Sequence, residues 1–312
     1  MYDSLLKEIK KFDKITIFRH FRPDGDCSFS SLALREFLKF NFKDKKIKCV
    51  ANDSYDLVPK NIKVSDSFIK DSLAIIVDCS NEDRTDDNRY RIAKSRFIID
   101  HHPGNPTHAE NTIVDTNVSA TCELLAKIFY SKTFSKYNIN PTICKYLYCG
   151  ILTDSNNFKT TNTTSDTFLI ANKLITDGKF KPSDLSEYVF STKYENFKKV
   201  SIFRSYLKIR DGVGYVVLNQ DDLDNIGMTF TDAKNSIDEF NVINEVKIWA
   251  VFAYNKSVGW YDGSIRSKRK YVINNLCNKY DGGGHKNACG VKKMTPERIE
   301  LLINDLIKIA NC

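Results

Sequence analysis

The feature that most constrains this fold is a set of short apolar runs that end abruptly in acidic or histidine residues. Residues 73–77 are all apolar, and Asp78 follows them at once. Residues 97–99 are also apolar, and the segment 100–103, Asp-His-His-Pro, follows them, with its proline stopping the strand. Continuous apolar strands are typical of a parallel sheet that helices cover on both faces. Polar groups at the carboxyl ends of such strands lie where open α/β sheets bind ligands.

Strands and helices alternate along the first half of the chain, which predicts a doubly wound α/β domain with helices on both faces of the sheet. Apolar and β-branched runs predict strands at residues 14–19, 46–51, 73–77, 96–99 and 112–114. Helical apolar spacing predicts helices at 28–40, 119–131, 141–152 and 165–177. Gly178 is expected to be the C-cap of the last helix.

The pattern changes after Gly178, and 312 residues are enough for two domains. We predict an N-terminal domain over residues 1–185, a helical linker over 186–210, and a smaller α/β domain with a mixed sheet over 211–312. Strands of this second domain are expected at 214–218, 246–254 and 257–266, and helices around 221–240 and 270–279.

The composition is that of an ordinary soluble protein, with 42% hydrophobic and 28% charged residues. No apolar run approaches the roughly 18 residues that a membrane span needs, and the charged N-terminus lacks a signal-peptide core. The nine cysteines are scattered without a Cys-x-x-Cys pair, which favours reduced thiols over disulfides or a structural zinc site. We therefore expect a cytoplasmic protein that has no membrane partner.

Positive charge gathers near the C-terminus. The formal net charge is +8, and residues 264–293 contain eight Lys or Arg against Asp281 alone. Such a segment can be a solvated basic face, which is common, or a surface for a polyanion such as a nucleotide. The charge by itself leaves both interpretations open.

Hard metal ligands follow three predicted strands and one predicted helix. The six candidates are His20, Asp24, Asp26, Asp78, His101 and Asp154, the last in the loop after helix 141–152. Pro23 and Gly25 tighten the first loop, so that its three ligand side chains can converge. A solvated turn would explain Pro-Asp-Gly-Asp alone, but it explains neither the preceding histidine nor the acids at other strand ends. The set therefore favours a metal site.

Two imidazoles and four carboxylates exceed the ligand set of one catalytic zinc, which takes about three protein ligands. They suit two divalent ions that share a carboxylate, and Asp78 is the predicted bridge because it stands alone at a central strand end. Oxygen and nitrogen ligands favour manganese, with magnesium, cobalt or iron as alternatives. Two such ions supply hydroxide near neutral pH and hold phosphate oxygens, so phosphoester hydrolysis is the expected chemistry.

These residues form four ordered motifs that resemble those of the DHH phosphoesterases. They are His20-x-x-Pro-Asp-Gly-Asp26, Asp78, Asp100-His101-His102, and Asp154 after Gly-Ile-Leu-Thr. A fifth motif, Gly282-Gly283-Gly284-His285-x-x-Ala-x-Gly290, resembles the signature of the DHH-associated C-terminal domain. Within this superfamily, the length and both domains are most similar to the bacterial oligoribonuclease (nanoRNase) and pAp phosphatase group.

The resemblance implies that two ions are held by separate ligand sets: His20 and Asp24 for one, Asp26, His101 and Asp154 for the other, with Asp78 between them. It implies that His102 contacts the scissile phosphate or assists the leaving oxygen, while Asp100 orients a ligand. Phe29 departs from the family pattern, which often has a small residue there. This departure puts the close packing of the first helical turn in doubt.

The C-terminal motif is expected to bind a substrate phosphate. Glycines 282–284 let backbone N–H groups approach an anion, and His285 can add a hydrogen bond or a charge. Arg266 can bind a phosphate through two parallel hydrogen bonds from its guanidinium group. Arg84 and the helix start at 119–121, Ser-Ala-Thr, are weaker candidates for substrate contact, because they could equally be a surface charge and an ordinary N-cap.

The favoured function is manganese-dependent hydrolysis of short oligoribonucleotides to mononucleotides and removal of the 3′-phosphate of 3′,5′-bisphosphate nucleotides (pAp). A hydrolase of linear dinucleotides from cyclic dinucleotide signalling (pApA) and an inactive nucleic-acid-binding module are the alternatives. The C-terminal motif disfavours an inorganic pyrophosphatase, and the length disfavours a processive exonuclease with added domains. The expected partners are short single-stranded RNA, short DNA, pAp and dinucleotides; a homodimer is left open.

Overall fold

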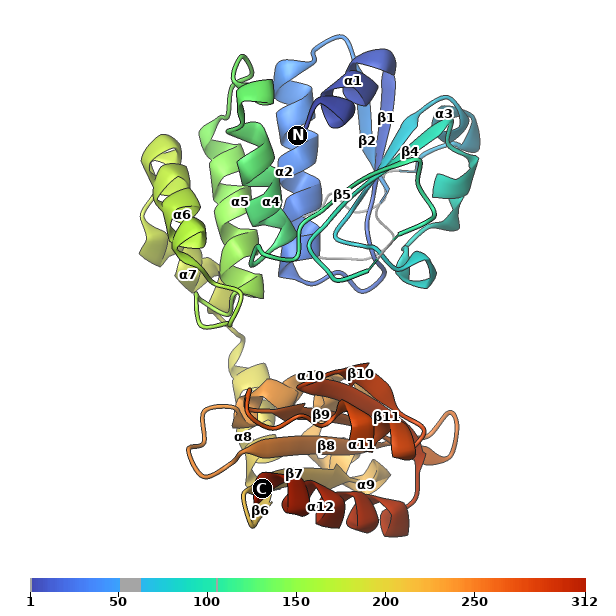
Figure 1. Ribbon diagram of the computed structural model, residues 1–312, viewed down its shortest axis with the longest axis vertical. Helices are drawn as coiled ribbons and strands as arrows, with labels where there is room; N and C mark the ends of the chain where they lie inside the picture. The colour runs from blue at the N-terminus through green and yellow to red at the C-terminus, as the bar shows by residue number, and fades with distance from the viewer. Residues whose placement is uncertain (1, 51–62, 105) are drawn as a thin grey trace. The chain divides into compact units, whose positions relative to one another are not determined.

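The computed structural model describes residues 2–50, 63–104 and 106–312 (Figure 1). The chain forms two compact units, Met1–Ser191 and Thr192–Cys312, and each has its own sheet and hydrophobic core. Among the described residues, no helix combines the length and the apolar character needed to cross a membrane.

The N-terminal unit is built on a five-stranded sheet whose neighbouring strands are all parallel. Its strands are β1 Lys14–Phe18, β2 Lys46–Cys49, β3 Leu73–Val77, β4 Ser95–Asp100 and β5 Asn111–Val114. The five predicted strands are confirmed; residue 51 of the second prediction lies outside the described residues. The order β2-β1-β3-β4-β5 reverses direction between β1 and β3, and doubly wound sheets bind ligands beyond the carboxyl ends of the two strands at such a switch point.

Helices cover both faces of this sheet, as predicted (Figure 1). They are α1 Asp3–Lys11, α2 Gly25–Asn41, α3 Asp66–Lys70, α4 Thr121–Phe129, α5 Pro141–Asp154, α6 Ser165–Gly178 and α7 Pro182–Phe190. One face buries a large core with residues of α1, α2, α4 and α5. The other face packs Phe68 and Ile69 of α3 against Phe18 and Ile76 of the sheet. The doubly wound α/β fold is therefore confirmed.

The C-terminal ends of α5 and α6 differ from the predictions. Helix α5 continues to Asp154, so this acid ends a helix and does not lie in a following loop. Gly178 is the last residue of α6, and Lys179 takes the left-handed C-cap conformation with φ of 50°. A Cβ atom on Gly178 would lie 2.7 Å from Cβ of Cys144, so the packing of α6 on α5, and not a positive φ, requires glycine there.

The C-terminal unit contains a mixed sheet, as predicted, and this sheet has six strands. Its strands are β6 Lys208–Arg210, β7 Val213–Leu218, β8 Ile248–Asn255, β9 Trp260–Ser267, β10 Gly283–His285 and β11 Ala288–Met294, of which β7, β8 and β9 were predicted. The order is β10-β11-β9-β8-β7-β6, in which only β7 and β8 are parallel neighbours. Helices α11 Asn274–Lys279 and α12 Pro296–Ala310 cover one face. Helices α8 Tyr194–Ser205, α9 Gln220–Ile226 and α10 Phe230–Asn235 pack on the other, with the 3₁₀ helix η4 Ser236–Phe240.

The segment predicted as a helical linker is helical only in part. Its last residues form β6, which pairs with β7 in an antiparallel hairpin. Asp211 and Gly212 connect the two strands, both with positive φ, 47° and 83°. An Asp-Gly pair between strands is a strong local hairpin signal, and the prediction of a continuous helical linker to residue 210 was wrong because this turn starts a β-hairpin there.

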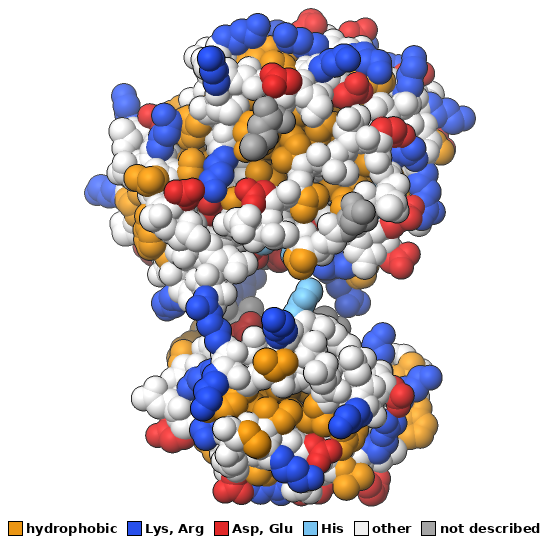
Figure 2. Space-filling view, viewed as in Figure 1, with side chains coloured by type: hydrophobic (Ala, Val, Ile, Leu, Met, Phe, Trp, Pro, Cys, Tyr) orange, Lys and Arg blue, Asp and Glu red, His pale blue; other side chains and the backbone are white. Residues whose placement is uncertain are grey.

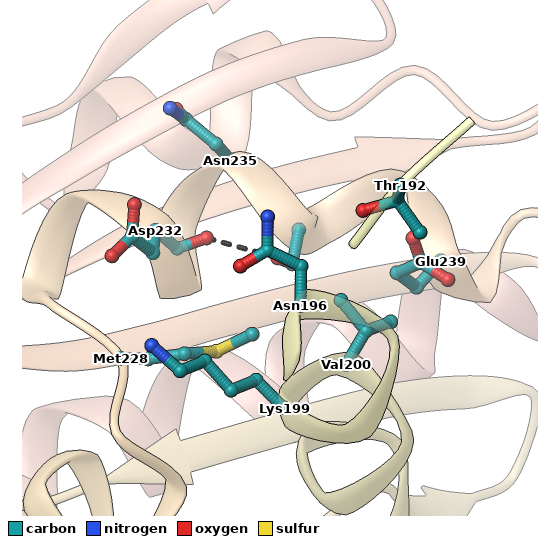
Figure 3. A pocket seen from close by; sticks show the side chains of 9 residues that line it. Thr192, Asn196, Lys199, Val200, Met228, Asp232, Asn235 and Glu239 are labelled. Carbon is teal, nitrogen blue, oxygen red and sulfur yellow. Dashed lines mark hydrogen bonds between the residues drawn. The ribbon is translucent and has the colours of Figure 1, made fainter. Parts of the chain in front are cut away.

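A cavity of about 380 Å³ lies in the C-terminal unit, between α8 and the α10–η4 region (Figure 3). Its lining mixes the apolar Val200 and Met228 with Asn196 and Asn235. None of the predicted metal-binding or phosphate-binding residues lines it, so it is separate from the predicted site residues.

Candidate metal centre

The six predicted metal ligands gather at the carboxyl edge of the five-stranded sheet. Asp24 caps α2 by accepting a hydrogen bond from the backbone N–H of Cys27. Because of this cap, the helix starts at Gly25, three residues earlier than predicted, and Asp26 lies in its first turn. The remaining ligands follow β1, β3 and β4 or end α5: His20, Asp78, His101 and Asp154. Ligand atoms of Asp26, His101 and Asp154 lie within 4.8 Å of one another.

Asp78 lies between the two buried histidines. Its Oδ2 atom is 3.6 Å from Nε2 of His20, and its Oδ1 atom is 3.7 Å from Nε2 of His101. These separations are too long for good hydrogen bonds, but they suit carboxylate oxygens that face two different cations. Asp78 has φ of 57°, a left-handed conformation that Asp and Asn tolerate better than other side chains. The geometry is that of a bridging ligand, a role that stays a prediction.

The donor atoms of this cluster fit divalent cations. Nε2 of His20 and Nε2 of His101 are buried and have no hydrogen-bond partner among the described residues. The other nitrogen of His20, Nδ1, is 2.9 Å from the backbone oxygen of Phe21, which directs Nε2 toward the carboxylates. A buried polar atom without a partner costs about 1–3 kcal/mol. A cation held jointly by imidazole and carboxylate groups removes that cost.

Asp26 is held in place by a helix from another part of the chain. Its Oδ2 accepts the backbone N–H of Thr121 at 2.6 Å, and its Oδ1 accepts that of Cys122 at 2.9 Å. The carboxylate therefore caps the first turn of α4. The Thr121 hydroxyl donates to Oδ1 of Asp78 at 2.8 Å, and Ser119 donates to the buried Glu123. This helix start thus positions two predicted ligands; its contact with substrate stays a prediction.

Asp100 orients the histidine pair. Its Oδ1 accepts the backbone N–H groups of His101 and His102 and lies 2.8 Å from Nδ1 of the His102 ring. His101 is buried, whereas the side chain of His102 is 44% exposed. Because Nδ1 of His102 is engaged by Asp100, Nε2 is the nitrogen left for a substrate. These contacts suit the orienting role expected for Asp100.

The ionisable groups of this centre lie close together, and their pKa values are shifted. Burial and the charges of Asp78 and Asp154 raise the pKa of Asp26 well above its usual range. Burial, together with Asp78 and Asp24, raises the pKa of Asp154 to about 6 against the opposing effect of His101. The hydrogen bond to Asp100 raises the pKa of His102 to about 9, against the opposing effect of burial. A bound cation would compete with these protons.

We expect the stabilisation by metal ions to increase with pH. The pKa of Asp154 rises from 3.8 to about 6 in the fold, so its contribution to metal-free stability is full below pH 3.8 and is lost as the pH rises through 6. His102 makes its full contribution to metal-free stability below pH 6.5, and this contribution is lost as the pH rises through about 9. Thermal unfolding should show a larger increase of Tm on adding Mn²⁺ at about pH 8 than at about pH 5. An equal or larger increase at the lower pH would contradict this expectation.

Two glycines allow the close packing of this centre. A Cβ atom on Gly25 would lie 2.3 Å from Cγ2 of Thr153, and one on Gly150 would lie 2.1 Å from Sγ of Cys122. Phe29 does not disturb the packing, because its side chain is buried in the core beside Tyr146. The small residues that this site requires are therefore at positions 25 and 150.

Comparisons with known proteins agree with this geometry. Residues 14–151 match the DHH family, N-terminal domain, and residues 211–311 match the DHHA1 domain. The bifunctional oligoribonuclease and PAP phosphatase NrnA of Mycoplasma genitalium is 30% identical over 97% of this chain and 96% of its own length. The chain is a DHH-family phosphoesterase.

Two further proteins are similar to this chain over most of its length. The uncharacterized protein MG371 of Mycoplasma genitalium is 33% identical over 90% of the chain and 87% of its own length. The crystal structure of an exopolyphosphatase-related protein from Bacteroides fragilis has a TM-score of 0.84 at 21% identity, covering 98% of this chain and 95% of that one. The second comparison shows that this DHH protein shares its two-unit fold with a solved structure.

In the DHHA1 domain, Arg266 and His285 lie in one row of the sheet. Arg266 of β9 is opposite Ala288 of β11, which is opposite His285 of β10. Directly opposed residues of antiparallel strands share a face, so the two cationic side chains belong to the same face. His285 is exposed, and Arg266 is half-buried and donates to the backbone oxygen of Ile265.

The glycines of the DHHA1 signature do not form a free loop. Gly283 and Gly284 belong to the edge strand β10, and Gly282 directly precedes it. A Cβ atom on Gly282 would lie 2.3 Å from the backbone oxygen of Gly290, and one on Gly284 would lie 2.3 Å from that of Ala288. These two glycines are therefore required by the β10–β11 hairpin itself. A Cβ atom on Gly283 would meet Oδ1 of Asn278 at an ordinary contact distance of 3.8 Å, and β10 as an edge strand has one row of backbone groups unpaired within the sheet. An anion can approach the strand from that side.

Arg84 lies beside the first DHH motif. It ends the short 3₁₀ helix η1 Glu82–Arg84, and its backbone oxygen accepts the N–H of Phe21 at 2.8 Å. The next residue, Thr85, pairs with His20 in an isolated bridge. The exposed Arg84 side chain is therefore near the ligand loop, and its contact with substrate stays a prediction.

Sequence reasoning missed two residues near these sites. Cys27 has its Sγ atom within 4.8 Å of ligand atoms of His20 and Asp78; its place next to Asp26 was the available signal. Burial, with the positive charges of Lys292 and Arg266, lowers the pKa of Lys234 on α10 against the opposing effect of Asp262, so Lys234 lies close enough to Arg266 for their charges to interact. No local pattern marks Lys234. Lys and Arg are spread over both units on the face shown in Figure 2, so charge alone did not locate it.

Proposed function

We propose that this DHH phosphoesterase uses two divalent ions, preferably Mn²⁺, to hydrolyse short oligoribonucleotides to mononucleotides and to remove the 3′-phosphate of pAp. The observation that carries the proposal is Asp78, whose two oxygens face the unpartnered Nε2 atoms of two buried histidines. The substrate class is supported by relatives named as bifunctional oligoribonucleases and PAP phosphatases, at about 30% identity.

The chain offers a separate ligand set to each ion. His20 and Asp24 would hold one ion, Asp26, His101 and Asp154 the other, and Asp78 would bridge them. Bound at this site, the ions would supply an activated water and charge to stabilise the phosphoryl transition state. The helix start that fixes Asp26 and Asp78 keeps these ligands oriented before substrate arrives, which lowers the cost of reorganisation.

His102 is the candidate for direct contact with the scissile phosphate. In the metal-free centre its pKa of about 9 keeps the ring protonated near neutral pH, and Asp100 holds Nδ1. The Nε2–H group is then free to donate to a phosphate oxygen, or to pass its proton to the leaving oxygen. The exposure of the ring leaves it accessible to substrate.

The DHHA1 domain would bind the non-scissile end of the substrate. Arg266 and His285 share a face, Lys234 adds a positive charge near Arg266, and the β10 edge offers backbone N–H groups beside Gly283. Such a set suits a terminal phosphate. Binding a terminal phosphate at a fixed position favours short substrates, because a long strand has no phosphate end at that place.

We expect Arg266→Ala and His285→Ala each to lower kcat/KM for pAp and for a dinucleotide about 10- to 100-fold, mainly through KM. The loss of a charge-assisted phosphate contact costs about 1.5–3 kcal/mol, which corresponds to that range. Hydrolysis of bis-p-nitrophenyl phosphate should fall much less, since this ester has no second phosphate to hold. Steady-state kinetics on the three substrates, with pApA and an RNA length series added, measures the difference.

Lys279→Ala is the matched control, because it removes one positive charge from the same basic segment on the helix α11. It should leave kcat/KM for pAp within about twofold of the wild-type value. Equal losses on all three substrates, or degradation of long RNA as fast as dinucleotides, would refute the role given to the DHHA1 domain.

A further inference from the structure

We propose that the thiolate of Cys27 is an additional ligand of the ion held by His20 and Asp78, and that it gives this position a preference for thiophilic ions such as Co²⁺ and Zn²⁺ over Mg²⁺. The inference rests on the metal centre of the proposed function and on no particular substrate. Cys27 lies in the first turn of α2, directly after Asp26, and its side chain is fully buried.

Three ligand atoms converge at this position. Sγ of Cys27, a ring nitrogen of His20 and a carboxylate oxygen of Asp78 all lie within 4.8 Å of one another. Nε2 of His20 is the nitrogen that faces Asp24 and Asp78, at 3.7 and 3.6 Å, and it is buried without a hydrogen-bond partner among the described residues. Metal–sulfur and metal–nitrogen bonds of about 2.3 and 2.0 Å fit ligand atoms at such separations around one ion.

Cys27 differs from the other cysteines of the chain. All nine lie in the described residues, and Cys27 alone belongs to such a group. Cys79, next to the bridging Asp78, donates to the backbone oxygen of Asn81 at 3.2 Å. Sγ of Cys122 is 3.8 Å from the backbone oxygen of Asp26. Asp24 fixes the position of Cys27 by accepting its backbone N–H at 3.0 Å.

The thiol changes the chemistry expected of the centre. Coordination breaks the S–H bond, forms a sulfur–metal bond and releases the proton to solvent, with no change of oxidation state. Oxygen and nitrogen ligands alone favour manganese, whereas a sulfur ligand raises the affinity for softer ions and does little for magnesium. The two positions of the centre would then differ in metal preference, since Asp26, His101 and Asp154 offer only oxygen and nitrogen atoms.

The test is cobalt titration of the full-length, metal-free protein followed by absorption spectroscopy. Wild type should show a thiolate-to-cobalt charge-transfer band in the near ultraviolet together with visible ligand-field bands. Cys27→Ala and Cys27→Ser should lose the charge-transfer band but keep the visible bands, and the matched control Cys79→Ala should keep both. The Co²⁺ affinity should fall at least about tenfold in the Cys27 variants while the Mg²⁺ affinity changes little.

Each other result has a defined meaning. A charge-transfer band that persists in both Cys27 variants, or is absent from wild type while the visible bands are present, would overturn the role of Cys27 and leave the two-metal centre intact. If wild type binds no Co²⁺ or Mn²⁺ by either spectroscopy or calorimetry, the metal centre of the proposed function fails as well. Thermal unfolding of the metal-free variants shows whether the substitution disturbed the fold; the serine variant retains most of the side-chain volume.

Discussion

Asp78→Asn is expected to lower hydrolysis of every substrate about a thousandfold or more, equivalent to about 4 kcal/mol of lost transition-state stabilisation. Each oxygen of Asp78 faces a different histidine, so the loss of its charge disturbs both ion positions. The loss should appear with pAp, a dinucleotide and bis-p-nitrophenyl phosphate alike, because all of them use the same centre. Steady-state assays with saturating Mn²⁺ measure it.

Asparagine is the informative replacement because Asp78 has φ of 57°. Asn adopts this conformation readily, whereas Ala would add backbone strain that confuses the result. Thr121→Val provides a graded comparison, since it removes the hydroxyl that donates to Oδ1 of Asp78 and leaves the carboxylate in place. Its activity should fall about 10- to 100-fold. Near-normal activity of a folded Asp78→Asn protein would refute the bridging role.

Removal of divalent metal is expected to abolish hydrolysis completely and reversibly. The carboxylates of Asp24, Asp26, Asp78 and Asp154 lie around two histidine nitrogens that have no hydrogen-bond partner among the described residues, and this donor set suits cations that would supply the main activation of the phosphate. Adding Mn²⁺ after exhaustive chelation should restore activity, and Mg²⁺ at the same concentration should restore less. Activity assays across a series of metal concentrations check both statements.

Thermal stability reports the binding of divalent metal and does not depend on catalytic turnover. At about a hundred times its Kd, an ion that binds only the folded protein adds about 3 kcal/mol, which raises Tm by roughly 5–10 °C for a unit of this size. The Asp78→Asn protein should lose most of this increase and serves as the control. Full activity after exhaustive chelation would overturn the two-metal assignment.

Local patterns in the sequence were enough to predict the parallel sheet and the residues at its edge. All five residues of β3 are buried, as a continuous apolar run requires in a sheet covered on both faces. The acid or histidine that ends each run cannot enter the same core without a partner, so it marks the strand end. The Asp-Gly turn before β7 was an equally local signal for β6, which was assigned to the helical linker; β10 and β11 were likewise not predicted as strands.

Contacts between distant segments could not be predicted in this way. Asp26 accepts hydrogen bonds from backbone groups of Thr121 and Cys122, about a third of the chain away, and Lys234 approaches Arg266 from a separate helix. Such pairs depend on how helices pack on the sheet, and helical spacing says nothing about which helix ends meet. The grouping of Cys27 with His20 and Asp78 is of the same kind.

The sequence by itself therefore determined the fold class, the types of ligand and the strand ends that carry them, because apolar periodicity and strand termination are local properties of the chain. Only the tertiary structure decided which atoms of those ligands face one another. The direction of the Asp78 carboxylate depends on a left-handed backbone and on the Thr121 hydroxyl, and α5 can approach Asp26 only because Gly150 has no side chain. These directions are set by the packing of α4 and α5 against α2, which no single segment specifies.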